Sequence, residues 1–328
     1  MSAAPILQQT PEWLEARSRC ITATDIAAIL GMHPYKSPAQ VYLDKTGEGR
    51  QIEPNAAMQT GAHLEPSIAA WWGIQNDKKP VHAAFALHPD EPIFGASPDF
   101  LVGDDAVLEC KWCGQNAAKG FGDGADEVPA HYLLQVQWQL FVTGRKIGYL
   151  CVLGPWGFRE YEIKGDSDLH RRMAHQARIF WNEYVLAEMP PPLSGSFGDK
   201  KLIEELHPVD DGRIVAASYE LEEEIAELGK ELVQIDELSK SAEGRKNRIK
   251  QFMGDAAVLE STEGKFGWKS TKDRTETDWQ GAFNELYAKY ADASSPAQLI
   301  APAEFVAAHT QTKPGYRRFT TPFRTERA

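Results

Sequence analysis

The spacing of apolar residues over the first 190 or so positions predicts helices first and strands afterwards. Each early helix carries a capping residue or a proline at its start, and a glycine ends two of them. The first predicted helix begins at Thr10-Pro11, and the second runs from Thr24-Asp25 to Gly31. The third runs from Ser37-Pro38 to Gly47, and the fourth covers about Asn55 to Ile74.

Beyond this region, apolar and polar residues alternate with a period of two, which indicates strands. The predicted strands cover 80–87, 93–102, 106–112, 147–153 and 158–163, and a helix from Pro129 to about Thr143 interrupts them. A last helical pattern starts near Ser167 and ends at the prolines 190–192. Helices around a mixed sheet make residues 1–195 an α/β or α+β domain.

Residues 196–328 form a C-terminal extension of a different kind. Apolar residues at heptad spacing, in a setting of Glu and Lys, predict a long exposed helix or a helical hairpin that continues to about Met253. A small α+β module follows, with a hairpin over 258–272 that turns at Glu263-Gly264 and helices near 277–290 and 302–309. The heptad residues are Leu221, Ile225, Leu228, Leu232 and Ile235.

The composition narrows the class of protein. The chain has 328 residues and a formal net charge of −12, so any nucleic-acid contact must be a local basic groove. The sequence has no apolar run of about 18 residues and no secretory signal pattern, which argues against a membrane span and against export. Four cysteines without framework spacing fit a reducing compartment, so we expect a cytoplasmic protein without membrane contact. Because Cys110-Lys-Trp-Cys113 has no second pair, it favours core cysteines over a zinc or redox site.

One predicted hairpin brings two carboxylates together. If Gly103-Asp104-Asp105 is a three-residue loop, Asp99 lies opposite Glu109, and the period of two puts Lys111 on the face of Glu109. Like charges at facing positions destabilise a sheet unless a cation lies between them, and a metal ion would serve. The alternative is a solvated hairpin edge with an ordinary ion pair, and spacing alone leaves both interpretations open.

These residues resemble a known nuclease motif. Pro98-Asp99 followed by Glu109-Cys-Lys111 is similar to the PD-(D/E)XK motif, and the first 190 or so residues resemble the lambda-type phage exonuclease and YqaJ-like viral recombinase family. Three further segments match the family's motifs in the same order: Arg17 with Ile21-Thr-Ala-Thr24-Asp25, Gly61-Ala-His-Leu-Glu65, and Gln135-Val-Gln137. The resemblance implies a restriction-endonuclease-like fold for this part of the chain, in which helices flank a mixed central sheet. It does not cover the helical arm and the small β extension that the C-terminal pattern predicts.

The resemblance also implies roles for single residues. Asp99, Glu109 and the backbone carbonyl of Cys110 would hold two Mg²⁺ ions, for which Mn²⁺ can substitute, and Glu65 would complete the site directly or through water. Lys111 would orient and activate the nucleophile. Gln135 would help to hold the geometry, although an amphipathic helix by itself favours a plain solvent face for this residue.

Arg17 and Thr24 have two interpretations. A helix start offers free N–H groups and an arginine can bind a phosphate with two hydrogen bonds, and the resemblance assigns this pair to the 5′-phosphate of the digested strand. The sequence alone favours simple capping by Thr24 and a surface arginine.

The activity implied by the resemblance is that of a Mg²⁺-dependent DNA exonuclease that digests the 5′-ended strand of duplex DNA and leaves 3′ overhangs. The alternatives are an endonuclease on the same fold and a DNA-end-binding protein without catalysis. The implied partners are double-stranded DNA ends, a single-strand annealing protein and further copies of the chain, since some relatives form ring trimers. The implied setting is the cytoplasm of a bacterial host, with a phage or prophage gene.

Basic and aromatic residues near the C-terminus suggest either a DNA platform or a small sheet with a basic exposed face and an aromatic core. The overall negative charge favours the small sheet. The residues are Lys265, Lys269, Lys272, Arg274, Arg317, Arg318 and Arg324, with Phe266, Trp268, Tyr316, Phe319 and Phe323.

Overall fold

The chain divides into two units, residues 1–211 and 212–327, each of which is described by itself. The structure, a computed structural model, describes residues 6, 10–49, 55–124, 127–282, 284–285, 307–313 and 317–320. The break between the units follows α8 (Phe197–Leu206), which the predicted division at residue 195 assigns to the extension. α8 packs against α3. The contact is close at Gly198, where an added Cβ would lie 2.8 Å from the backbone nitrogen of Ser37.

The first helices begin largely where their caps predict. α1 (Pro11–Ser18) is capped by Thr10, α3 (Pro38–Thr46) by Ser37, and α4 (Ala56–Asn76) by Asn55. α2 (Ala23–Ile29) is the exception, because it starts after Thr22 and not at Thr24. The carboxylate of Asp25 accepts hydrogen bonds from the backbone N–H of Thr22 (2.9 Å) and from its hydroxyl (2.6 Å), which sets the helix start two residues earlier than predicted.

A five-stranded mixed sheet forms the centre of unit 1, in the order β1-β4-β5-β6-β7. β5 (Ala106–Trp112) and β6 (Ile147–Gly154) pair in parallel, and the crossover between them contains α6. All other neighbouring strands of this sheet are antiparallel. The remaining strands of this sheet are β1 (Val81–His82), β4 (Phe100–Val102) and β7 (Gly157–Lys164).

The strands predicted over 80–87 and 93–102 are each divided in two. β2 (Ala86–Leu87) and β3 (Gly95–Ala96) leave the central sheet and pair with each other. Pro98 has no N–H to donate and Asp99 turns its carboxylate to the next strand, so the chain changes partners at this point.

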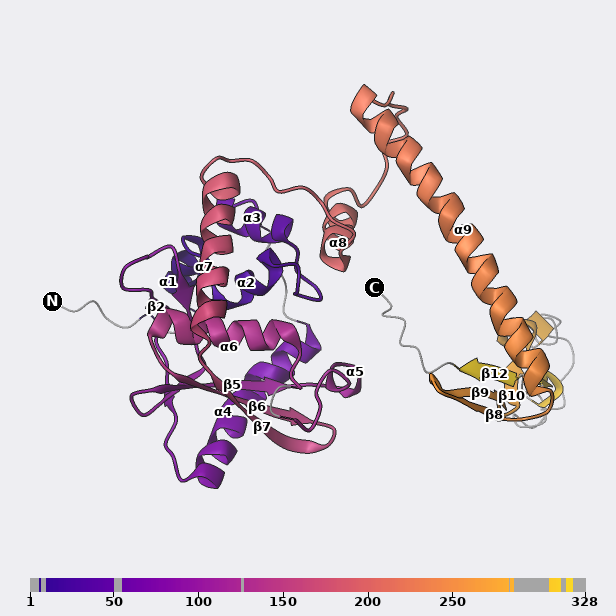
Figure 1. The fold of residues 1–328 in the computed structure, drawn as a ribbon, viewed down its shortest axis with the longest axis horizontal. Coiled ribbons are helices and arrows are strands. Elements are labelled where there is room, and N and C mark those ends of the chain that lie inside the picture. The colour runs from indigo at the N-terminus through magenta and orange to yellow at the C-terminus, as the bar shows by residue number, and fades with distance from the viewer. Residues whose placement is uncertain are drawn as a thin grey trace, which may run out of the picture. The chain divides into compact units, whose positions relative to one another are not determined.

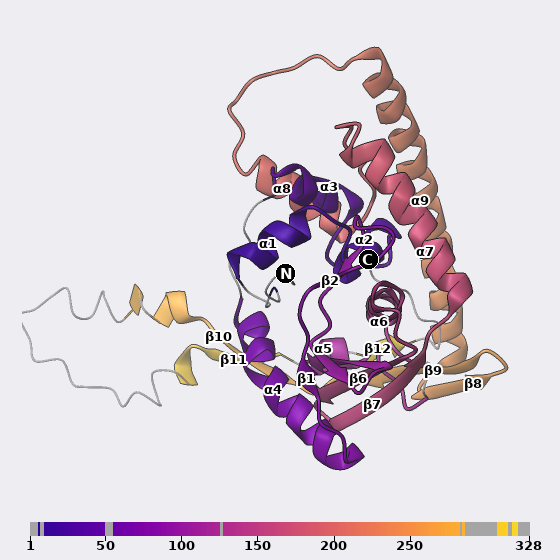
Figure 2. The same cartoon turned by 90° about the vertical axis from the view of Figure 1, so that its left-hand side faces the viewer.

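Helices cover both faces of the sheet, as Figures 1 and 2 show. Leu108 and Cys110 of β5 pack on α4, whereas Val107 packs on the face covered by α6 (Ala130–Thr143). α2, α3 and α7 (Ser167–Phe180) pack together with α6 in a further core cluster, and α7 continues into a π-helical turn over Trp181–Val185. The remaining helix, α5, covers Gln115–Ala118. The predicted α+β fold with a flanked mixed sheet is therefore confirmed.

Unit 2 is built on one long helix, α9 (Tyr219–Met253), so the predicted arm is a continuous helix and not a hairpin (Figure 1). Its heptad residues Leu221, Ile225, Leu228, Leu232 and Ile235 are 50–57% exposed.

A small sheet in the order β12-β9-β8 also belongs to unit 2. Its strands are β8 (Val258–Ser261), β9 (Gly264–Ser270) and β12 (Arg317–Thr320), and the pair Ser261–Gly264 closes the turn at the predicted place. β10 (Arg274–Thr277) and β11 (Thr310–Lys313) form a separate pair.

The basic and aromatic residues of the C-terminus fit the small-sheet interpretation where they are described. Phe266 is buried in β9, and the β9–β12 register pairs Lys269 with Arg318. Tyr316, Phe323 and Arg324 lie outside the described residues, as do the end of the helix predicted over 277–290 and the start of that over 302–309.

All four cysteines are free thiols within buried positions, as predicted for core residues. Among the described helices, none combines the length and the apolar character that crossing a bilayer requires.

Candidate functional site

The β4–β5 hairpin has the predicted register. Val102 pairs with Ala106 and Phe100 with Leu108, so Asp99 and Glu109 are the next facing positions beyond the end of the ladder. Asp99 does not continue the strand, because its Oδ2 accepts a hydrogen bond from the Cys110 N–H at 2.8 Å. This bond holds the carboxylate of Asp99 beside the peptide that follows Glu109.

Glu109 is buried, and three donors surround its carboxylate. Gln135 donates to Oε1 at 2.5 Å, Gln139 donates to Oε2 at 2.7 Å, and the ammonium of Lys111 forms an ion pair with Oε1. Gln135 therefore faces the sheet, and the plain solvent face that its helix pattern favours is wrong. Gln139 was not predicted as a site residue; its only signal is the spacing of four from Gln135 on an otherwise apolar helix.

Lys111 stays charged in this position. Burial opposes the charge, but Glu109 and Asp99 outweigh it, and the pKa of Lys111 is raised above its ordinary value. Its Nζ lies 5.7 Å from the centroid of the Tyr132 ring. The ammonium group of Lys111 is thus held among the carboxylates of Glu109 and Asp99.

Among the three predicted carboxyl ligands, Asp99 and Glu65 accept fewer hydrogen bonds from the described residues than Glu109 does. Burial, followed by the charge of Glu109, raises the pKa of Asp99 well above its ordinary value, and the same two causes raise the pKa of Glu65. Glu65 belongs to α4, which packs on the opposite face of the sheet from α6. Helices from both faces and the hairpin between them bring the predicted set together.

The donor set fits a hard cation in its chemistry. Asp99 Oδ1 has no hydrogen-bond donor among the described residues, and Glu109, Glu65 and the Cys110 carbonyl supply only oxygen, which Mg²⁺ prefers. Within the described ranges, no three acidic, histidine or cysteine side chains already cluster as metal ligands. Lys111, Gln135 and Gln139 contact the carboxylate of Glu109, so a cation would have to compete with Lys111 for Oε1.

The raised pKa of Asp99 predicts how stability depends on pH without metal. A carboxyl group that binds its proton more tightly when folded lowers the free energy of unfolding as the pH rises from about 4 through its raised pKa. Asp99→Asn removes this contribution, so the variant should be more stable than the wild type at pH 7, and the difference should shrink as the pH falls towards 4. Urea unfolding in EDTA at pH 4 to 7 measures the difference.

The comparison uses the difference between the two proteins because groups such as Asp25, whose pKa is lowered, contribute equally to both. For Asp25, burial is outweighed by Lys36 and Lys45. Mg²⁺ should reduce the difference in unfolding free energy between the two proteins, because it binds and stabilises the folded wild type. A difference that stays constant between pH 4 and 7 would contradict the assignment.

Arg17 and Thr24 lie together, as the family motif implies. The Arg17 Nη2 donates to Thr24 Oγ1 at 3.2 Å, and the guanidinium lies 4.5 Å from the centroid of the Trp13 ring. Trp13 Nε1 in turn donates to Ser97 Oγ at 2.8 Å, two residues before Asp99. Thr22 caps α2, so the prediction that Thr24 caps this helix is wrong.

A pocket of about 220 Å³ is lined by Thr24 of this pair and by two residues that contact Glu109. Thr24 lines one part of it, and Lys111 and Gln135 line another. Four aromatic side chains that the sequence did not single out as site residues also line it, and these are His33, Tyr35, His131 and Tyr132.

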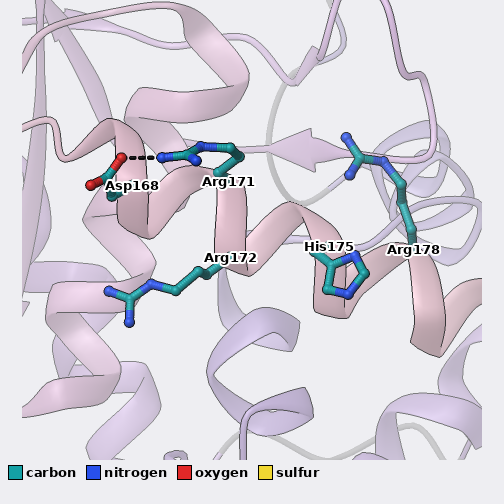
Figure 3. A pocket seen from close by; sticks show the side chains of 5 residues that line it. All are labelled: Asp168, Arg171, Arg172, His175 and Arg178. Carbon is teal, nitrogen blue, oxygen red and sulfur yellow. Dashed lines mark hydrogen bonds and ion pairs between the residues drawn. The ribbon is translucent and has the colours of Figure 1, made fainter.

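A second pocket, of about 590 Å³, lies on the outer face of α7 (Figure 3). Arg171 is ion-paired with Asp168, and Arg178 contacts Glu91 through two hydrogen bonds of 2.6 Å. All its lining residues come from α7, and none of them contacts Asp99, Glu109 or Glu65.

Comparison with known proteins identifies the family. Residues 12–146 match the YqaJ-like viral recombinase domain. "Uncharacterized protein YqaJ" of Bacillus subtilis (strain 168) is 31% identical over 252 residues, which cover 75% of this chain and 78% of that protein. The chain belongs to the YqaJ-like viral recombinase family. The resemblance found in the sequence is thereby confirmed.

Three further proteins are similar to parts of this YqaJ-like chain. "Uncharacterized protein R354" of Acanthamoeba polyphaga mimivirus is 30% identical over 148 residues, 42% of this chain and 27% of that protein. The crystal structure of the alkaline exonuclease LHK-Exo from Laribacter hongkongensis is 25% identical, with a TM-score of 0.46, and covers 61% of this chain and 99% of that one. A phage-related exonuclease from Haemophilus somnus 129PT is 14% identical, with a TM-score of 0.41, and covers 52% and 96%.

Proposed function

We propose that unit 1 is a Mg²⁺-dependent DNA exonuclease that digests the 5′-ended strand of linear duplex DNA and leaves 3′ single-stranded overhangs. The observation that carries the proposal is the buried Glu109 carboxylate, held by Lys111 and Gln135 with Asp99 at the facing position of the same hairpin. The PD-(D/E)XK resemblance of these residues supports the proposal, and so does the family, which is one of viral recombinases.

In this proposal Asp99, Glu109, the Cys110 carbonyl and Glu65 hold the metal, either Mg²⁺ or Mn²⁺. Two ions, when bound, would polarise the scissile phosphate and lower the pKa of the attacking water. Lys111 would orient that water and stabilise the negative charge that develops on the phosphate, since its ammonium is charged and held by Glu109. Gln135 would keep the Glu109 carboxylate in place.

The test uses purified protein, Mg²⁺, a linear duplex labelled separately at each end, and closed circular DNA. The proposal expects loss of label from the 5′ ends, no cutting of the circle, and no reaction in EDTA. Cutting of the circle would identify an endonuclease on the same fold. Binding of the linear DNA without any cutting would identify an end-binding protein.

Arg17 is proposed to bind the terminal 5′-phosphate, with Thr24 beside it. Trp13 and Thr24 hold the guanidinium in place before DNA arrives. We expect the wild type to digest 5′-phosphorylated ends about thirtyfold faster than 5′-hydroxyl ends, because hydrogen bonds to a charged group contribute roughly 2 kcal/mol.

Arg17→Ala should lose this preference, whereas Arg19→Ala should keep it, because Arg19 is exposed and paired with Glu15. Initial rates on the two end types measure the ratio. Equal rates in the wild type, or an unchanged ratio in Arg17→Ala, would return Arg17 to a structural role.

The resemblance also supports two partners, a single-strand annealing protein and further copies of the chain, and action in the cytoplasm of a bacterial host from a phage or prophage gene. Light scattering of the protein with and without a DNA end tests self-association. A monomer under both conditions would reject the ring.

A further inference from the structure

The pocket between α2 and α6 has the right neighbours to hold part of a nucleotide. Thr24, which contacts Arg17, is on its lining, and so are Lys111 and Gln135, which contact Glu109. If a 5′-phosphate lies at Arg17 and the next phosphate lies at Lys111, the nucleoside that joins them has to lie between these residues. The pocket is the space that the described residues leave there.

His33 lines this pocket and carries a hydrogen-bond donor. Its Nδ1 accepts the backbone N–H groups of Tyr35 (3.1 Å) and Lys36 (2.9 Å), so in the neutral ring the hydrogen is on Nε2. Burial, and after it the charge of Lys36, lowers the pKa of His33 to about 4. The imidazole is therefore neutral at pH 7, and its Nε2–H has no acceptor within the part of the chain that the structure describes.

The other rings of the pocket are uncharged as well. The ring centroid of His131 lies 5.7 Å from that of His33, edge to face, and burial, His33 and Lys111 lower the pKa of His131 to about 4. Tyr35 is 67% exposed and meets His33 and Phe197 with its ring in T-shaped contacts, which leaves ring surface open to solvent. Neutral rings with a few donors suit a flat heterocycle, and phosphates are better matched to Arg17 and Lys111.

We propose that this pocket binds the nucleobase of the 5′-terminal nucleotide, with Tyr35 as a stacking surface and the His33 Nε2–H as a donor to the base. The proposal rests on the proposed function, since it needs one phosphate on each side of the pocket. The volume of about 220 Å³ is below the roughly 300–1,000 Å³ of pockets for drug-sized ligands, so it suits one base and not a base pair. Phe197 of α8 lies outside the pocket lining and contacts the Tyr35 ring edge to face, with 6.1 Å between the ring centroids.

The test compares two 5′-phosphorylated duplexes, one with an ordinary terminal nucleotide and one with an abasic tetrahydrofuran residue at that position. In single-turnover reactions with Mg²⁺, the wild type should make the first cut about tenfold faster on the ordinary end, within the range that stacking of one base supplies. Tyr35→Ala should bring the ratio of the two rates close to one, and Tyr35→Phe should restore it. Met32→Ala, an exposed neighbour outside the pocket lining, should keep the wild-type ratio.

A binding experiment gives a second measurement that needs no cleavage. Calorimetry in EDTA should show that dTMP binds the wild type about tenfold more tightly than deoxyribose 5-phosphate, and that Tyr35→Ala abolishes this difference. Equal wild-type rates on ordinary and abasic ends, or an unchanged ratio in Tyr35→Ala, would overturn the base pocket while leaving the nuclease proposal intact. Absence of cleavage on both duplexes would overturn the proposed function instead.

Discussion

Asp99→Asn is expected to lower the rate of DNA cleavage in Mg²⁺ about a thousandfold, because a catalytic metal contributes several kcal/mol and about 4 kcal/mol corresponds to this factor. The amide keeps the size of the side chain and can still accept the Cys110 N–H. It lacks the charge that a divalent cation needs. Single-turnover cleavage of an end-labelled duplex measures the loss.

The matched control is Asp104→Asn, which removes the same charge from the exposed loop of the same hairpin and should cleave at the wild-type rate. Circular dichroism distinguishes loss of chemistry from loss of structure. Asp99→Asn should be fully folded and more stable than the wild type in EDTA, since one of the mutually repelling carboxylates is gone. Cleavage by Asp99→Asn within a few-fold of the wild type would reject the site.

Lys111→Met is expected to separate cleavage from binding. The rate of cleavage should fall by roughly a hundredfold to a thousandfold, the cost of losing one group that stabilises developing charge. Affinity for a duplex end should change little, and the dependence of affinity on salt should keep its slope within about one unit, since one lysine is a small part of the phosphate contacts. Fluorescence anisotropy in EDTA gives affinity and slope.

Stability should respond in the opposite direction from Asp99→Asn. Without Lys111, Glu109 keeps two amide donors but loses its cation in a buried place, which costs about 3 kcal/mol of unfolding free energy. Lys164→Met, at an exposed position of β7, is the control and should change neither rate nor stability by much. If affinity collapsed together with cleavage in a folded Lys111→Met, the lysine would be an anchor for DNA.

The hairpin of the site could be predicted from the sequence because its register depends on a short, local turn. Once Gly103 begins a three-residue loop, the period of two determines that Asp99 faces Glu109 and that Lys111 shares its side. The start of α2 was misplaced although its signal is equally local. Thr22 and Asp25 have the capping-box spacing, and the prediction took Thr24 as the cap.

The donors and rings around the hairpin could not be predicted in the same way. Gln139 contacts Glu109 only because α6 crosses the sheet between β5 and β6, and helical spacing cannot tell a polar stripe that faces a buried carboxylate from one that faces water. His33 and His131 come from segments far apart in the sequence, and the packing of α2 on α6 brings them into contact. Nothing in the residues near either histidine signals the other.

The position of β5 has a consequence for amide hydrogen exchange. β5 lies in the middle of the five-stranded sheet and is hydrogen-bonded to β6 along its whole length, so Glu109 and Lys111 belong to a strand that opens only when the sheet does. We expect the backbone amides of this strand to be among the last of unit 1 to exchange with deuterium. A partial opening of the chain should therefore leave Asp99, Glu109 and Lys111 in place. Heat or denaturant should remove activity only in step with the cooperative unfolding of the sheet.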